Sequence, residues 1–179
     1  MTENSNLENL RATKLGIFFA LVTLLYGFGL GGAFGAFEDE LKDHLKSGAE
    51  SVLDSKYDSD TVKAKKTTDK SWVYFKRAHL HANGLGTSSL VLILLLSSLP
   101  ANRVIKSGTA FALGLGSFGY SLFWMFAGLR APGLGSTGAA KESLKWLAVP
   151  SSGLCILGLF VVFVLSCRYL FMKTQHTAK

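Results

Sequence analysis

The sequence predicts an all-α integral membrane protein: a four-helix bundle with a helical extramembrane excursion between its first two spans. Three observations support this fold class. The 179-residue chain contains four long apolar runs, only 17% of its residues are charged, and its 19 glycines are clustered. Soluble domains contain about 25% charged residues, so this composition excludes an ordinary soluble domain and a disordered chain.

The first apolar run, residues 15–37, contains no charged residue. A helix of this length is about 34 Å long, which is enough to cross a hydrocarbon core of roughly 30 Å. Arg11 and Lys14 before the run and Ala33-Phe34-Gly35 near its end also resemble a signal peptide with a cleavage site. Because the run is longer than a signal-peptide core, we expect a spanning helix that is retained.

A polar segment, residues 38–77, follows the first span and contains nine basic and nine acidic residues. Leu41, Leu45 and Leu53 belong to a narrow apolar stripe, which predicts a helix that either extends the first span or lies on the membrane surface. Asp69 or Ser71 is a candidate N-cap for a helix that runs into the second span. We therefore expect a small helical hairpin outside the membrane, which could also dock a soluble partner.

Three more runs complete a single membrane domain, residues 1–179, with further spans at about 79–99, 107–129 and 146–170. Four spans place both termini on the same side of the membrane. Arg11 and Lys14 precede the first span and three acidic residues follow it, which favours cytoplasmic termini in what we expect to be a bacterial inner membrane. The raw number of basic residues in the long loop favours the opposite orientation.

The net charge of +7 is distributed in small groups at the ends of the apolar runs. This distribution indicates anchoring to membrane lipid and disfavours a nucleic-acid surface. The four uninterrupted apolar runs contain no Asp, Glu, Lys or Arg, which disfavours an ion-coupled transporter. No nucleotide-binding, metalloprotease or serine-hydrolase motif is present, so we expect no catalytic residue and no catalytic activity of the chain alone. Tyr120, Trp124, Met125 and Cys155 are expected to be packing residues.

Two spans carry rows of glycine at helical spacing. The rows consist of Gly27, Gly31 and Gly35 in the first span and Gly108 and Gly116 in the third. Such rows let two helix backbones approach and gain van der Waals contact in lipid. We expect them to pack helices within the chain. The alternatives are contact with a flat cofactor or lipid, and assembly with other membrane subunits or a second copy.

The segment 71–86, S-W-V-Y-F-K-R-A-H-L-H-A-N-G-L-G, is the one stretch that indicates a binding site. Its candidate cofactor-binding residues are His79, His81, Asn83, Arg77 and Lys76. Because residues two apart on a helix point about 200° from each other, His79 and His81 cannot hold one metal ion together. Each histidine is instead a candidate axial ligand of haem b or a hydrogen-bond partner of a quinone head group. The alternative is that both histidines bond only to backbone, lipid head groups or the long loop.

The remaining histidines, His44 and His176, lie outside the spans. A haem with two histidine ligands would therefore need two copies of the chain, a partner chain, or a loop that brings His44 back to the membrane.

Residues 77–86, R-A-H-L-H-A-N-G-L-G, resemble histidine-bearing helix starts of haem-copper oxidase and nitric oxide reductase catalytic subunits and their small relatives. In those proteins, the helix that begins in this way carries a haem ligand. The resemblance implies a redox setting for ten residues of this chain and no particular activity. Our hypothesis is a small subunit of a larger membrane assembly for respiratory electron transfer, with a haem or quinone site at the membrane edge. A purely structural subunit without cofactor and a small-solute transporter or channel are the alternatives.

Overall fold

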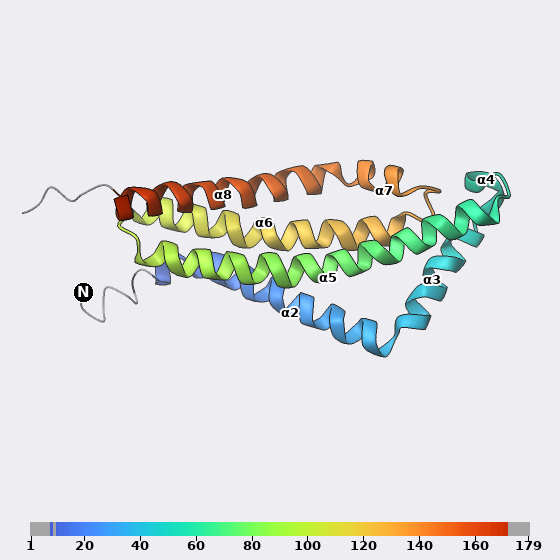
Figure 1. Cartoon of the computed structure of the whole chain (residues 1–179), viewed down its shortest axis with the longest axis horizontal. Coiled ribbons are helices and arrows are strands. Elements are labelled where there is room, and N and C mark those ends of the chain that lie inside the picture. The colour runs from blue at the N-terminus through green and yellow to red at the C-terminus, as the bar shows by residue number, and fades with distance from the viewer. Residues whose placement is uncertain (1–7, 9, 172–179) are drawn as a thin grey trace, which may run out of the picture.

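The computed structural model describes residues 8 and 10–171, and this part of the chain is helical and contains no strand. Four of its helices are long and apolar enough to cross a membrane: α2 (Lys14–Ala36), α5 (Thr61–Ser98), α6 (Arg103–Arg130) and α8 (Lys145–Phe171). They run side by side along the long axis of the molecule (Figure 1). The predicted fold class, a four-helix membrane bundle with a helical excursion, is confirmed.

Helix α6 is the centre of the bundle, because it packs against α2, α5 and α8. In its most apolar stretch 56% of the residues are buried, compared with 11% in α8, whose outer face is left to lipid or to another subunit. Small residues allow the close packing: a Cβ on Gly16 of α2 would collide with the Ala110 carbonyl of α6, and one on Gly114 would collide with Gly16.

Helix α5 extends far beyond the membrane. Its 38 residues correspond to about 57 Å, nearly twice the thickness of a hydrocarbon core. The helix begins after Asp60, whose side chain accepts hydrogen bonds of 2.9 Å from the backbone N–H groups of Val62 and Lys63. The expected cap at Asp69 or Ser71 is wrong, since both residues lie inside this helix.

The excursion folds back onto α5. Helix α2 diverges from α5 towards its C-terminal end, and α3 (Glu38–Glu50) then returns towards α5 (Figure 1). Phe37, at φ −133° and ψ 31°, interrupts the helical conformation between α2 and α3, so α3 is not an extension of the first span. Helix α4 (Leu53–Tyr57) follows and reverses the chain into α5.

A linker with one short helix, α7 (Thr137–Ser143), joins α6 to α8 and meets the excursion. Tyr57, which is fully buried, donates a hydrogen bond of 2.7 Å from its hydroxyl to the Pro132 carbonyl. Gly135 has a φ of +75°, and a Cβ there would lie 2.8 Å from the Cβ of Lys56. We call residues 38–77 together with the linker 131–144 the head, because these contacts make them one unit at this end of the bundle.

Candidate functional site

The two histidines of α5 share one local feature although they face different neighbours. The His79 Nδ1 atom lies 2.8 Å from the Gly27 carbonyl oxygen of α2, and the His81 Nδ1 atom lies 2.8 Å from the Arg77 carbonyl oxygen. In a neutral imidazole that donates Nδ1–H to a carbonyl, Nε2 carries the free lone pair. Each ring can therefore accept a proton or bind a ligand at Nε2.

His79 faces α2 and fills the space above the glycine row of the first span. A Cβ on Gly31 would lie 2.8 Å from its Cε1 atom, and the Phe34 ring lies edge-on with 6.0 Å between the ring centroids. The neighbouring Asn83 donates a hydrogen bond of 3.1 Å to the His79 carbonyl, and its Oδ1 atom lies against Gly27. Gly27 and Gly31 thus accommodate side chains of α5.

His81 faces α6 and belongs to an aromatic group. Its ring centroid lies 5.3 Å from that of Tyr120 and 5.7 Å from that of Trp124. The Arg77 guanidinium lies over the Trp124 ring, 4.9 Å from its centroid. Its distance to the centroid of the Tyr74 ring is 5.4 Å. The indole Nε1 of Trp124 is buried and has no hydrogen-bond partner. We call Arg77, His81, Tyr120 and Trp124 the His81 cluster.

An apolar groove lies further along the bundle, between α5 and α8. Leu85, Ser88 and Leu92 follow His81 at helical spacing on the same face of α5, and they form one wall. Leu113 of α6 lies at the floor, and the opposite wall comes from α8 with Cys155, Ile156 and Leu159. Its volume is about 630 Å³. We call it the α5–α8 groove; the His81 cluster does not line it, but His81 lies on the α5 face that forms its wall.

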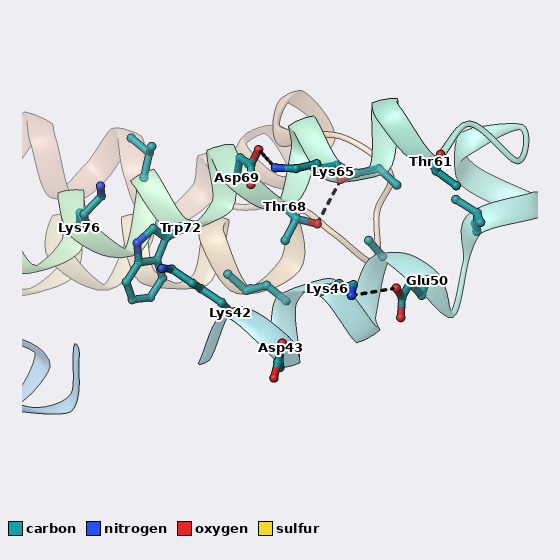
Figure 2. A pocket seen from close by; sticks show the side chains of 15 residues that line it. Lys42, Asp43, Lys46, Glu50, Thr61, Lys65, Thr68, Asp69, Trp72 and Lys76 are labelled. Atoms are coloured by element: carbon teal, nitrogen blue, oxygen red, sulfur yellow. Dashed lines mark hydrogen bonds and ion pairs between the residues drawn. The ribbon is translucent and has the colours of Figure 1, made fainter. Parts of the chain in front are cut away.

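The five predicted binding residues are not brought together. His79 and Asn83 point to α2, His81 and Arg77 to α6, and Lys76 lines a separate groove in the head beside Trp72 (Figure 2). Sequence reasoning treated Tyr120 and Trp124 as packing residues and missed their place beside His81. Their four-residue spacing, close to the same end of a span as His81, is the signal that could have found them.

The head groove between α3 and α5 has a volume of about 740 Å³. Apolar residues line it (Leu45, Ala49, Leu53, Ala64 and Val73). Four of the charged residues at its rim form ion pairs within their own helices, Lys46 with Glu50 at 3.8 Å and Lys65 with Asp69 at 2.7 Å (Figure 2). A hydrogen bond to Glu38 raises the pKa of Lys42, which therefore stays cationic beside the Trp72 ring. The groove thus offers apolar surface and no dominant charge.

The glycines of the two rows also contact different helices. Gly27 and Gly31 contact α5, and a Cβ on Gly116 would meet Ser151 and Cys155 of α8. Gly35 and Gly108 have no atom of another part of the chain within 4 Å of a Cβ position. Gly16 and Gly114, which the spacing did not single out, make the closest backbone approach between α2 and α6.

Ligands for a metal ion do not gather in the described part of the chain: no group of three His, Cys, Asp or Glu residues converges there. His44 is exposed on α3, and His176 lies outside the described residues. No family model, no curated protein and no solved structure matches the chain.

Proposed function

We propose that this protein is a small membrane subunit of a respiratory electron-transfer assembly, and that it binds a quinone with the head group at the His81 cluster and the isoprenoid tail in the α5–α8 groove. One observation carries the proposal: a histidine whose Nδ1 bonds to a backbone carbonyl, which leaves Nε2 for a ligand, lies beside a tyrosine on the helix face that further along forms one wall of an apolar groove. A quinone has the same division into a polar ring and a long apolar chain.

The His81 cluster offers the contacts that such a head group needs. The His81 Nε2 atom can accept a hydrogen bond from a quinol hydroxyl, and the Tyr120 hydroxyl can donate one to a quinone carbonyl. The planar rings of Tyr120 and Trp124 add stacking surface. Because one histidine is sufficient for this ligand, the opposite directions of His79 and His81 do not count against it.

Haem b fits these residues less well. Haem iron in electron-transfer proteins is generally held by protein ligands on both faces. His79 is packed against Gly31 and Phe34, so a porphyrin ring could approach it only if α2 moved away. His81 has no second histidine on its side of α5. A haem at His81 would need its other ligand from a second copy or a partner chain.

The proposal is tested by protection of Cys155, which lines the α5–α8 groove. In a Cys167→Ser background, Cys155 is the single cysteine, and its alkylation by a membrane-permeant maleimide is followed at alkaline pH, because only the ionised thiol reacts. A quinone with a ten-carbon tail should slow this alkylation several-fold, whereas the same ring without a tail should not. His81→Gln should abolish the protection, and His79→Gln, which alters the opposite face of α5, should retain it. Equal protection in both variants would contradict the assignment to His81.

A reduced-minus-oxidised absorption spectrum of the purified protein separates quinone from haem. The quinone proposal predicts a flat spectrum in the Soret and α-band regions. A Soret band that disappears in His81→Gln would replace the quinone by a haem at the same cluster.

A purely structural subunit is the second candidate, and the close packing of Gly16, Gly114 and Gly116 favours it. In that case no quinone would protect Cys155 and the His81 variant would leave the assembly unchanged. The head groove would then be the surface most suited to a soluble partner, because it offers exposed apolar area.

A further inference from the structure

The end of the bundle opposite the head contains a basic cavity. Its volume is about 340 Å³, and its lining comes from the N-terminal segment, from the α5–α6 connection and from the first turn of α6. Three of the lining side chains are basic, Arg11, Arg103 and Lys106, and one is acidic, Glu8. Basic side chains thus outnumber acidic ones among the described residues that line the cavity.

The position of Lys106 makes this more than a group of surface cations. Lys106 is only 4% exposed, and its ammonium group donates a hydrogen bond of 2.8 Å to the Ser97 carbonyl near the C-terminal end of α5. Arg103 is the first residue of α6, and the first turn of this helix contains no acidic residue. The helix dipole is positive at this end, so a guanidinium there favours the binding of an anion.

The surroundings favour an anion that carries acyl chains. Large apolar side chains are exposed in the first turns of the two helices that begin here, Leu15 and Phe18 on α2 and Val104 on α6. Guanidinium groups bind phosphate oxygens in a two-pronged geometry, and basic pockets between spanning helices are suited to lipid head groups. We infer that this cavity binds the phosphodiester head group of an anionic phospholipid, whose chains lie along the exposed faces of α2 and α6.

The test compares lipids retained by the full-length protein after exposure to an equimolar mixture of phosphatidylglycerol and phosphatidylcholine with identical chains, counted by native mass spectrometry. We expect the wild type to retain phosphatidylglycerol preferentially. Arg103→Gln should reduce this preference about fivefold, the effect of one basic residue at a membrane surface. Arg11→Gln, on the other side of the cavity, should act in the same direction.

Arg168→Gln is the matched control, because Arg168 lies near the end of α8 at the same end of the bundle (Figure 1) and does not line the cavity. Its lipid preference should equal that of the wild type. Equal losses in Arg103→Gln and Arg168→Gln would overturn the inference and leave general surface charge as the cause. Displacement of the lipid by millimolar inorganic phosphate would also overturn it, since a free anion would then be the ligand.

Discussion

At the scale of single residues, Tyr57 shows how one side chain holds the head together. Its ring lies in a small apolar core with Ala49 and Ala64, and its hydroxyl reaches the Pro132 carbonyl, 75 positions further along the chain. Hydrogen bonds of this kind contribute about 1 kcal/mol net, and an unpaired buried acceptor costs about 1–3 kcal/mol.

Tyr57→Phe should therefore lower the free energy of unfolding by about 1–3 kcal/mol. The phenylalanine keeps the ring in the core and removes only the hydroxyl, so the loss reports the hydrogen bonds of that hydroxyl, with Pro132 and with Thr67. The measurement is thermal or denaturant unfolding of the purified protein in detergent. Tyr169→Phe, on a side chain that is 62% exposed, should change nothing. An unchanged free energy of unfolding in Tyr57→Phe would show that the hydroxyl bonds equally well to water when the protein is unfolded.

The same residue predicts a dependence on pH. Burial raises the pKa of the Tyr57 phenol, although its hydrogen bond with Thr67 and the charge of Lys63 oppose the shift. A folded-state pKa above the unfolded value of 10.0 means that the contribution to stability is complete below pH 10 and is lost as the pH rises through the folded-state pKa. The stability difference between wild type and Tyr57→Phe should thus be constant from pH 7 to about 9 and shrink above pH 10. A difference that grew with pH would refute the assignment.

The histidines show what the sequence can and cannot predict for single residues. The regular period of a helix is enough to predict that His79 and His81 face opposite sides. The neighbours on each side could not be predicted, because they depend on how α2 and α6 are rotated about their own axes. Tyr120 and Trp124 were therefore assigned to packing, although they form the group around His81.

At the scale of helices, the importance of a glycine for packing depends on which atoms lie next to it and not on its spacing in the sequence. Gly108 and Gly116 belong to one row, yet only Gly116 lies at a helix contact. A Cβ on Gly116 would lie 2.7 Å from the Ser151 carbonyl oxygen and 2.9 Å from the Cys155 backbone nitrogen. Backbone atoms cannot move aside as a flexible side chain can.

Gly116→Ala should therefore separate α6 from α8 and lower the free energy of unfolding by about 1–3 kcal/mol, the usual cost of overpacking. Gly108→Ala should be neutral or add up to about 1 kcal/mol, because alanine is the better helix former and meets no neighbour. Unfolding of the two variants in the same detergent checks the pair. Equal destabilisation would mean that Gly108 contacts a second subunit.

The apolar pattern predicted the positions of the helices in the spans, but it did not predict where helices begin in the head. The apolar runs expected at 107–129 and 146–170 lie within α6 and α8. Asp69 and Ser71, the candidate N-caps for the helix that enters the second span, lie too late in the chain, because that helix already begins after Asp60. A polar helix outside the membrane has no uninterrupted apolar run to reveal it.

For the whole molecule, the two ends of the bundle are chemically different. The head end carries the His81 cluster and paired charges, whereas the other end carries the basic cavity. The membrane fold was predictable because a run of about 20 apolar residues is long enough to span a bilayer, where a helix satisfies all of its own backbone hydrogen bonds. The docking of the excursion onto the linker was not, since the contact of Tyr57 with Pro132 joins segments that share no sequence pattern.

The difference in charge between the two ends of the bundle predicts how the protein is oriented in the membrane. Arg11 and Lys14 lie at the start of the first span and Arg103 begins α6 at the same end of the bundle, whereas several lysines of the head are paired with carboxylates. The first span usually sets the topology, and its basic flank stays in the cytoplasm. We therefore expect the end with the basic cavity to be cytoplasmic and the head to lie outside.

Single cysteines placed at the two ends decide between the orientations. Val62, 75% exposed near the start of α5, and Ala101, in the connection before α6, are suitable positions. In a background without Cys155 and Cys167, a membrane-impermeant maleimide applied to intact cells should label Val62→Cys and spare Ala101→Cys until the membrane is permeabilised. The reverse pattern would place the head in the cytoplasm, so that the His81 cluster would lie at the cytoplasmic edge and the lipid cavity at the outer one.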